Sequence, residues 1–315
     1  MIGFDIGGTK CAVCAGEEKD GGLIIRNKEM IPTDHTCSPY EMIDQMCRLA
    51  EAMEERIDRI GISCGGPLNE KEGTILSPPN LPGWDQVEIV RYLNNRYGAT
   101  VSLQNDANAC ALAEWKYGAG KGCQNMIFLT FGTGMGAGLI LDGKLYAGTN
   151  GMAGEIGHIR MADYGPVGYG KAGSLEGFCS GSGIAQIGQM IAREKLQMGT
   201  GVSYCQTLGE LDRITAKSIA ECADQGYEDA VEVYRICGKF LGQGLSVLID
   251  LLNPERIVLG GIFPRSGHLL RDVANAVVEK ESLVSTRSVC TVVPAMLGEN
   301  IGDYAALAVA AMEEK

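Results

Sequence analysis

Short apolar runs, separated by glycine-rich or polar segments, recur along the chain. Apolar runs of roughly four to eight residues bounded by such turn signals are typical of buried strands. They predict strands at residues 1–5, 11–16, 59–64, 100–103, 125–131, 137–141, 256–259 and 289–293. Asp142-Gly143 is the dipeptide of a hairpin turn and predicts a further paired strand after Leu141.

Longer segments carry apolar residues at helical spacing. Ser38-Pro39-Tyr40-Glu41 combines an N-cap, a first-turn proline and a glutamate three residues after the cap, and helical periodicity follows to Met53. Further helices are predicted at residues 105–117, 228–252 and 298–312. Because strands and helices alternate, we expect an α/β fold.

One strand–turn–strand pattern occurs twice. Ile6-Gly7-Gly8-Thr9-Lys10 joins the first two predicted strands, and Gly132-Thr133-Gly134-Met135-Gly136 joins another two. A glycine turn of the same kind, reused about 125 residues later, predicts two similar lobes.

Composition and charge exclude several classes of protein. The chain has 315 residues, of which 45% are hydrophobic, and this suits two domains with sizeable cores. The net charge is −12 without clustered lysines and arginines, so no nucleic-acid partner is expected. No apolar run is long enough for a membrane span, and the early Asp5 with its glycine pair does not fit a secretory signal. We expect a cytoplasmic enzyme without a membrane partner.

The 12 cysteines are scattered singly and predict buried, reduced thiols. Cys11 and Cys14 form a C-x-x-C pattern, but in a strand this spacing sends them to opposite faces. Metal or redox chemistry is therefore not expected there.

The segment Asp5–Lys10 is the first candidate site. Glycines allow backbone N–H groups to converge on an anion, while Thr9 and Lys10 add a hydroxyl donor and a cation. Asp5 at a strand end suits a hydrated Mg²⁺. The alternative is an ordinary hairpin turn. Gly132-Thr133-Gly134 repeats the pattern, and two such turns, one per lobe, suit a polyphosphate.

Asn105-Asp106 follows a predicted strand and begins a predicted helix. An acidic residue in this place is commonly an N-cap. The functional alternative makes Asp106 a general base, with Asn105 binding a polyol through hydrogen bonds.

A third constellation is Gly154-Glu155-Ile156-Gly157-His158, followed by Glu176. Carboxylates and an imidazole each accept or donate hydrogen bonds to a ring of hydroxyls. The alternative is a capped turn. His35 and His268 lack such neighbours and receive no role.

Together these motifs resemble a known family. The Asp5–Lys10 motif, Asn-Leu-Pro-Gly-Trp at 80–84, Asn-Asp-Ala-Asn-Ala at 105–109, Gly-Thr-Gly-x-Gly at 132–136 and Gly-Glu-x-Gly-His at 154–158 occur in this order. The chain resembles, over essentially its whole length, the ROK family of bacterial sugar kinases and related repressors. This resemblance implies an actin-like ATPase fold, in which two ribonuclease-H-like lobes flank a cleft for ATP and sugar.

The resemblance also implies roles for individual residues. Asp106 matches the catalytic base that deprotonates a sugar hydroxyl. ATP and phosphate contacts are implied for Asp5, Gly7, Gly8, Thr9, Lys10, Gly132, Thr133, Gly134, Gly260 and Gly261, with Mg²⁺ held by Asp5 through water. Sugar contacts are implied for Asn80, Asn105, Asp106, Glu155, His158 and Glu176.

One segment departs from the family pattern. Many members carry a structural zinc site with the pattern C-x-C-G-x-x-G-C-x-E, whose cysteine positions are occupied here by Val167, Tyr169 and Ser174. Stable zinc binding needs about four N or S ligands, so no zinc is expected. The segment is then expected to be held by packing and hydrogen bonds around Tyr164 and Tyr169.

The implied lobes give domain boundaries. We expect a small lobe at residues 1–117 with the C-terminal helix 298–315, and a large lobe at 118–297. Gly118-Ala119-Gly120 reads as the hinge. The resemblance also implies a homodimer.

The leading hypothesis is an ATP-dependent hexose kinase acting on glucose or a close relative. The alternatives are a sugar-responsive transcriptional regulator of the same family and a non-catalytic sugar-binding protein. Regulators in this family carry a DNA-binding domain before the first phosphate motif, which lies here at Asp5. The sequence leaves the hexose open, and we expect the segments 65–84 and 165–173 to determine it.

Overall fold

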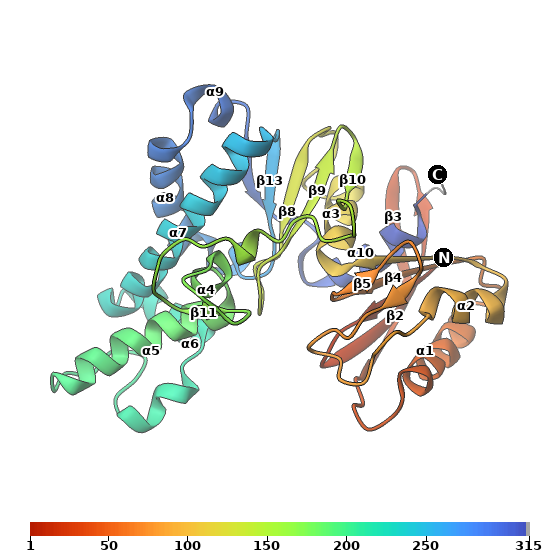
Figure 1. The fold of residues 1–315 in the computed structure, drawn as a ribbon, viewed down its shortest axis with the longest axis horizontal. Helices are drawn as coiled ribbons and strands as arrows, with labels where there is room; N and C mark the ends of the chain where they lie inside the picture. The colour runs from red at the N-terminus through yellow and green to blue at the C-terminus, as the bar shows by residue number, and fades with distance from the viewer. Residues whose placement is uncertain (313–315) are drawn as a thin grey trace. The chain divides into compact units, whose positions relative to one another are not determined.

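A computed structural model describes residues 1–312, and Figure 1 traces their helices and strands. The chain forms two compact units. One unit contains Met1–Phe128, Gly138–Ala153 and the chain from Met296 onward, and the other contains Leu129–Ala137 and Gly154–Ala295. The last three residues of the predicted C-terminal segment, 313–315, lie outside the described residues.

The first unit is built on a sheet with the strand order β3-β2-β1-β4-β7. Strand β2 pairs antiparallel with β1 and β3, whereas β1, β4 and β7 are parallel. The carboxyl ends of these parallel strands therefore meet at one edge, where Cys64 lies opposite both Ile6 and Asn105. The strands are β1 (Ile2–Ile6), β2 (Lys10–Lys19), β3 (Gly22–Pro32), β4 (Arg59–Cys64) and β7 (Thr100–Asn105).

Side chains alternate between the two faces of this sheet. On one face, Ile2, Phe4 and Ile6 form a core with helices α1 (Pro39–Met53) and α2 (Ile89–Tyr97). On the other face lies α10 (Ile301–Ala310), which packs on β1 and β4. A β-carbon built on Gly61 would lie 2.1 Å from the Ala306 backbone oxygen, so the glycine lets this helix approach closely.

Cys11 and Cys14 confirm the alternation. Cys11 belongs to the core beneath α1, whereas Cys14 packs with Leu307 of α10. The predicted orientation of the C-x-x-C pair toward opposite faces is therefore confirmed.

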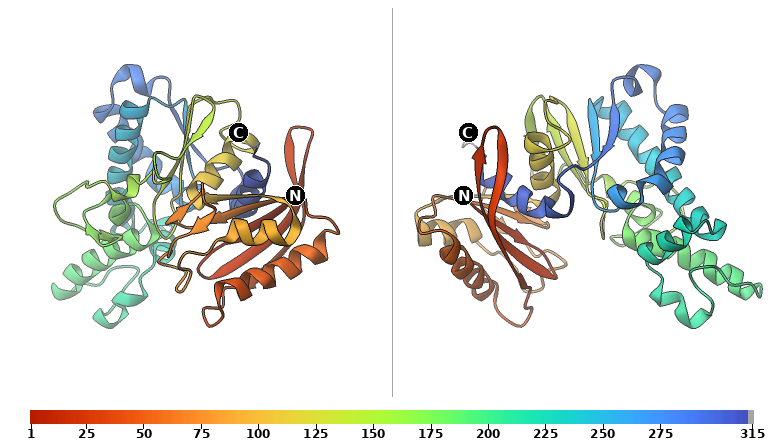
Figure 2. Two further views of the ribbon diagram at one scale, coloured as in Figure 1. Left: turned by 45° about the vertical axis from the view of Figure 1, so that its right-hand side comes forward. Right: turned by 180° about the vertical axis from the view of Figure 1, so that it is seen from behind.

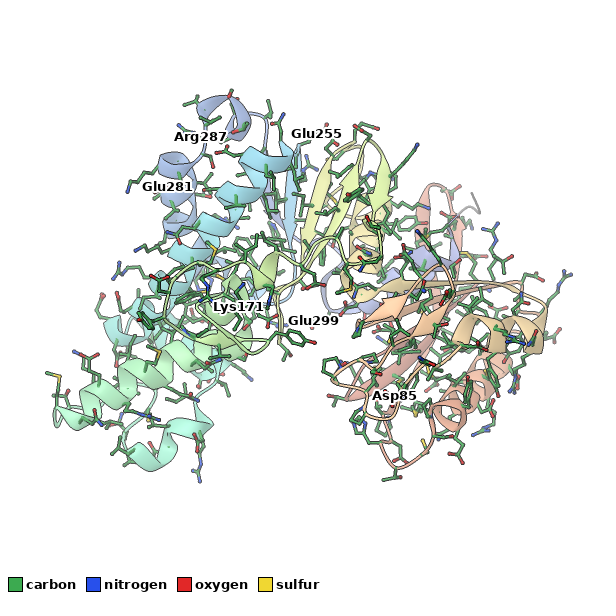
Figure 3. The ribbon with its side chains drawn as sticks, viewed as in Figure 1. Asp85, Lys171, Glu255, Glu281, Arg287 and Glu299 are labelled. Atoms are coloured by element: carbon green, nitrogen blue, oxygen red, sulfur yellow. The ribbon has the colours of Figure 1, made fainter. Side chains whose placement is uncertain are left out.

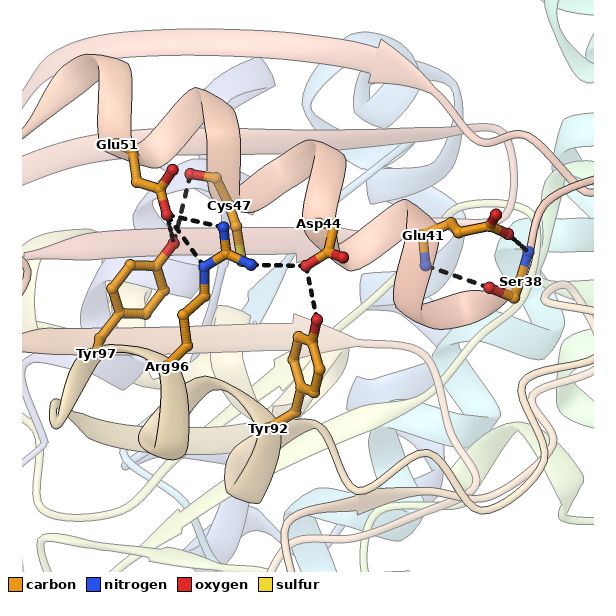
Figure 4. A network of polar contacts seen from close by, with 8 residues as sticks. All are labelled: Ser38, Glu41, Asp44, Cys47, Glu51, Tyr92, Arg96 and Tyr97. Atoms are coloured by element: carbon orange, nitrogen blue, oxygen red, sulfur yellow. Dashed lines mark hydrogen bonds and ion pairs between the residues drawn. The ribbon is translucent and has the colours of Figure 1, made fainter.

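Helix α1 begins with the predicted capping box, in which Ser38 accepts from the Glu41 N–H and the Glu41 side chain accepts from the Ser38 N–H. Figure 4 shows this cap and the polar network that joins α1 to α2. Arg96 lies 2.7 Å from Asp44 and 3.0 Å from Glu51. These contacts fix α2 beside α1, on the face away from α10.

The second sheet repeats the order of the first, as β10-β9-β8-β13-β14. The antiparallel pair β9–β10 corresponds to β2–β3, and the parallel pair β13–β14 corresponds to β4–β7. The predicted fold, with two ribonuclease-H-like lobes as in actin-like ATPases, is confirmed. The strands are β8 (Met126–Leu129), β9 (Ala137–Leu141), β10 (Lys144–Tyr146), β13 (Arg256–Leu259) and β14 (Thr291–Pro294).

Helices and short hairpins complete the described chain, and Figure 2 shows them from two further sides. Helices α7 and α8 pack along each other in the second unit. The remaining helices are α3 (Asp106–Tyr117), α4 (Leu175–Phe178), α5 (Gly181–Gln197), α6 (Ala216–Asp224), α7 (Glu228–Leu252), α8 (Phe263–Glu281) and α9 (Val284–Arg287). The remaining strands are β5 (Leu68–Asn69), β6 (Thr74–Ile75), β11 (Val167–Gly168) and β12 (Lys171–Ala172), and the 3₁₀ turns are η1 (Ile156–His158), η2 (Leu208–Arg213) and η3 (Gly298–Asn300).

Most predicted elements are present, but several observed elements were not predicted. Among them are helix α8, the edge strand β3 and helix α2, and exposed polar residues interrupt the apolar positions of the last two. The strand predicted at residues 289–293 begins instead at Thr291. Within residues 1–312, no helix is both long and apolar enough to cross a membrane.

Candidate functional site

Three parallel strands of the first unit end where the sequence predicts chemistry. Asp5 is the penultimate residue of β1, Gly65 follows β4, and Asn105 ends β7. Ligands commonly bind beyond the carboxyl ends of parallel strands in α/β sheets. The predicted residues of this unit are therefore brought to one edge of the sheet.

Asp5 lies in an acidic environment. Burial raises the pKa of its carboxyl group to about 6, and the nearby carboxylates of Asp303 and Asp106 add to the increase. A hydrogen bond from Ser63 and the charge of Lys10 act in the opposite direction. Each of these two carboxylates affects the pKa of Asp5 more than the charge of Lys10 does, and a carboxyl group among further carboxylates suits a divalent cation.

Asp303 belongs to α10 and is only 2% exposed. Its Oδ2 lies 2.5 Å from the Lys28 Nζ of strand β3, which forms its ion pair. Neither residue was predicted as part of the site. A lone carboxylate among the apolar residues of Ile301–Ala310 is the sequence signal that could have found Asp303.

The glycine turn between β1 and β2 is closed by hydrogen bonds. The Gly7 N–H donates to the Lys10 carbonyl at 3.1 Å, and the Thr33 hydroxyl donates to the Gly7 carbonyl at 2.6 Å. A β-carbon on Gly8 would lie 2.4 Å from the Asn80 carbonyl oxygen, so only glycine fits against that loop. Thr9 and Lys10 are exposed at the turn. The turn and Asn80 are therefore neighbours in the first unit.

Asn105, and not Asp106, is the N-cap of α3. The Asn105 side chain accepts from the Ala107 N–H at 3.0 Å, and Asp106 Oδ1 accepts from the same N–H at 2.8 Å. The Asp106 side chain is exposed, yet desolvation by the surrounding protein raises its pKa, partly offset by these hydrogen bonds. An accessible carboxylate with increased basicity is suited to accept a proton.

In the second unit, the turn Gly132–Gly134 lies beside the beginning of α5. The Gly181 N–H donates to the Gly132 carbonyl at 2.8 Å, and the Ser182 hydroxyl donates to the Thr133 carbonyl at 3.1 Å. The positive end of this helix dipole favours an anion near the turn.

Gly260-Gly261 lies against the same turn. Gly261 has a φ of +60°, and a β-carbon there would lie 2.0 Å from the Phe131 carbonyl oxygen. The Ile262 N–H also donates to this oxygen, at 2.6 Å. The structure thus brings the predicted nucleotide-contacting residues of the second unit together.

Glu176 is half-buried and holds this turn from another side. Its Oε2 accepts from the Met135 N–H at 3.0 Å. Glu155 precedes the 3₁₀ turn Ile156–His158, His158 is its last residue, and both are exposed. A β-carbon on Gly157 would lie 2.0 Å from the Met135 carbonyl oxygen, so this turn packs directly beside Glu176.

Hydrogen bonds hold the segment that departs from the family pattern. The Gln186 side chain bonds both the N–H and the carbonyl of Val167, at 2.8 and 2.9 Å. Ser174 caps α4, accepting from the Gly177 N–H at 3.1 Å. Lys171, labelled in Figure 3, donates to the His158 carbonyl at 2.6 Å.

The expectation that Tyr164 and Tyr169 hold this segment is wrong. The two tyrosines are 88% and 73% exposed, and polar side chains with close glycine packing hold the backbone instead. Residues 1–312 contain no group of three or more histidine, cysteine, aspartate or glutamate side chains that could hold a metal ion.

Comparisons with known proteins confirm the family resemblance. Residues 1–313 match the ROK family. The chain is 33% identical over 305 residues to the glucokinase of Streptomyces coelicolor, covering 96% of this chain and 94% of the relative. It is 28% identical to the xylose repressor of Caldicellulosiruptor bescii, covering 78% of this chain and 60% of that protein.

Among solved structures, a ROK family glucokinase from Streptomyces griseus, in complex with glucose and AMPPNP, has a similar fold. The TM-score is 0.78 at 30% sequence identity, and 99% of each chain is covered.

Proposed function

The chain belongs to the ROK family, and from this premise we propose that it transfers the terminal phosphoryl group of ATP to a hexose, glucose or a close relative. The observation that carries the proposal is the single sheet edge that gathers Asp5, the Gly7–Lys10 turn and Asn105-Asp106. A relative of 33% identity named glucokinase, and a similar structure holding glucose and AMPPNP, support this assignment.

Asp106 is the proposed general base. Phosphoryl transfer requires in-line positioning, neutralisation of charge and a carboxylate that accepts the proton of the attacking hydroxyl. Asp106 is exposed at the beginning of α3, and desolvation raises its pKa, so its carboxylate is a better proton acceptor than an ordinary aspartate.

We assign Gly7, Gly8, Thr9 and Lys10 to one phosphate-binding element and Gly132, Thr133 and Gly134 to another. Gly260-Gly261 is assigned to the adenosine. Glycine leaves open space beside the backbone at Gly132, and at Gly8 it lets the turn lie directly against Asn80. Beside the second turn, the α5 dipole lowers the cost of placing negative charge.

Asp5 would hold Mg²⁺, which neutralises phosphate charge when bound. The residues present fit this ion, because the carboxylates of Asp303 and Asp106 both act on the Asp5 carboxyl group. One protein carboxylate is sufficient when phosphate oxygens and water complete the coordination.

Asn80, Asn105, Glu155, His158 and Glu176 are the proposed sugar contacts, together with Asp106. In the first unit, the side chains of Asn80 and Asn105 flank Gly65-Gly66, whose missing β-carbons leave room beside them. Glu176 already accepts a backbone N–H with one oxygen, which orients the carboxylate. We place the choice among hexoses in the segments 65–84 and 165–173.

Further parts of the proposal concern the whole protein. We propose that residues 1–117 with the C-terminal helix act as the small lobe, that 118–297 act as the large lobe, and that Gly118-Ala119-Gly120 is the hinge. We also propose a cytoplasmic homodimer. Light scattering should give twice the chain mass of 33.5 kDa.

A sugar-responsive regulator is the second candidate, supported by the 28% identity to the xylose repressor. The net charge of −12 is unfavourable for a DNA-binding surface on this chain. The proposed general base and the two phosphate-binding turns count against a non-catalytic sugar-binding protein, because sugar binding alone requires neither.

The test is a coupled assay of ADP release across glucose, fructose, mannose, allose, N-acetylhexosamines and β-glucosides. Turnover that depends on one of these sugars, on ATP and on Mg²⁺ is expected. If the protein binds one of these sugars but phosphorylates none of them, the result would favour the second candidate, the sugar-responsive regulator.

A further inference from the structure

Glu114 is a fully buried carboxylate outside the proposed chemistry. It lies on α3, is 0% exposed, and accepts hydrogen bonds from three backbone N–H groups. Its Oε1 accepts from Met296 and Leu297, both at 2.9 Å, and its Oε2 accepts from Ala119 at 2.7 Å. Charge-assisted hydrogen bonds of this length are among the stronger ones in proteins.

The three donors belong to two segments far apart in sequence. Ala119 follows the end of α3 at Tyr117, whereas Met296 and Leu297 stand where the chain enters the first unit after Ala295. A β-carbon on Gly118 would lie 2.1 Å from Glu114 Oε2, so glycine allows the backbone to wrap around this carboxylate. Glu114 thus fastens α3 to the segment that leads into α10.

These two helices carry or contact the proposed active carboxylates. Helix α3 begins with Asp106, and α10 carries Gly302, where a β-carbon would lie 2.4 Å from Asp5 Oδ2. Helix α10 also packs against α3 and against β1 and β4. The placement of α10 on α3 therefore affects the spacing between Asp106 and Asp5.

We propose that Glu114 is a positioning residue, which fixes α10 to α3 and thereby sets the position of Asp106 relative to Asp5. This inference rests on the proposed kinase reaction for its effect on rate. The hydrogen bonds that Glu114 accepts belong to the fold itself, and their effect on the protein can be measured without turnover.

Two substitutions separate this role from simple packing. Glu114→Gln keeps the size of the side chain, but turns an amide NH₂ toward at least one of the three N–H donors, because two oxygens become one. Glu114→Ala removes both acceptor oxygens and with them all three hydrogen bonds. Displacing a reacting group from its productive position lowers the rate by about 10- to 100-fold. We therefore expect kcat of Glu114→Gln to fall by roughly this factor. The KM values for hexose and ATP should change by less than about threefold.

Asp229→Asn is the matched control. Asp229 also holds the backbone of a distant segment, accepting from the Ser203 N–H at 2.5 Å and from the Ser203 hydroxyl at 2.8 Å, but it lies in the second unit. We expect this variant to lower the Tm and to leave kcat within about twofold of the wild type. Comparison at a temperature where all variants are folded removes the effect of stability.

Hydrogen exchange provides the readout that does not depend on activity. In the wild type, the amides of Ala119, Met296 and Leu297 should be protected, and Glu114→Gln should reduce their protection together with that of Ala107 at the beginning of α3. Asp229→Asn should change none of these amides.

Three outcomes would overturn the inference. They are fast exchange of the three amides in the wild type, unchanged protection of Ala107 in Glu114→Gln, and a fall in kcat no larger than that of Asp229→Asn. A wild type that phosphorylates no hexose would refute the proposed function, and the exchange of these amides would still decide whether Glu114 positions α3.

Discussion

Asp106 combines accessibility with a raised pKa, the two properties that a general base needs. Asp106→Asn keeps the size of the side chain and removes the proton acceptor. Because general-base catalysis contributes about 10²–10⁴-fold, we expect the ADP-release rate to fall by this factor. Calorimetry should show hexose binding within a few-fold of the wild type, since the amide still forms hydrogen bonds. Turnover within about tenfold of the wild type would exclude Asp106 as the base.

Asp5 makes the stability of the protein depend on pH. Its pKa in the folded state is about 6, above the ordinary 3.8, so folding disfavours its ionised form. The cost to stability is absent below the ordinary pKa, grows as the pH rises toward 6 and stays constant above it. In EDTA, Asp5→Asn should therefore gain stability over the wild type as the pH rises from below 3.8 to 7.5, by about 3 kcal/mol, because a shift of one pKa unit corresponds to about 1.4 kcal/mol.

Thermal melts between pH 4.5 and 7.5 measure this difference. Asp58→Asn, at an exposed aspartate that pairs with Arg56, is the control and should show no such trend. A difference between Asp5→Asn and the wild type that stays constant with pH would contradict the environment described for Asp5.

At the scale of elements, periodicity was informative where an element contributes one continuous face to the core. Residues 228–252 were predicted with both ends as observed, because their apolar positions repeat regularly up to Asn253-Pro254. Strand β3 lies at the sheet edge, and its exposed arginine, asparagine and glutamate conceal the strand pattern.

The candidate site was predictable only as far as local motifs extend. Asp5, Asn105 and Asp106 lie in short motifs at strand ends, so the sequence could indicate them. Glu114 accepts from amides five and more than 180 residues away in sequence, at Ala119 and Met296, and only the tertiary fold makes this contact. The pairing of Asp303 with Lys28 was hidden for the same reason.

The segment from Val167 to Ser174 is expected to be stable without zinc. Cysteine is absent from the three positions of the family pattern, Gln186 bonds the N–H and the carbonyl of Val167, and the Ser174 hydroxyl donates to the Lys171 carbonyl. Protein purified without chelator should contain far less than one zinc per chain by elemental analysis, and EDTA should leave its Tm unchanged. Near-stoichiometric zinc, or a chelator-dependent loss of stability, would show that other ligands bind the metal.

At the scale of the molecule, one topology is used twice, and each copy places a glycine turn between its first two strands. In the first unit this turn stands beside Asp5, and in the second it stands beside α5 and Gly260-Gly261. The glycine turns of the two units are therefore of the same kind but lie beside different residues. This difference is what the proposed function requires, because a metal-bound phosphate and a nucleoside need different contacts.

Ligand binding to the folded protein should therefore separate the candidate functions without any measurement of turnover. A ligand at 100 times its Kd stabilises the folded state by about 2.7 kcal/mol, or about 5 °C in Tm at roughly 2 °C per kcal/mol. A kinase should gain stability both from hexose and from AMPPNP with Mg²⁺, and Asp5→Asn should lose most of the Mg²⁺-dependent part. A sugar-responsive regulator or a sugar-binding protein should respond to the sugar alone. Stabilisation by hexose with no response to AMPPNP at millimolar concentration would therefore count against the kinase, since the two glycine turns would then bind no phosphate.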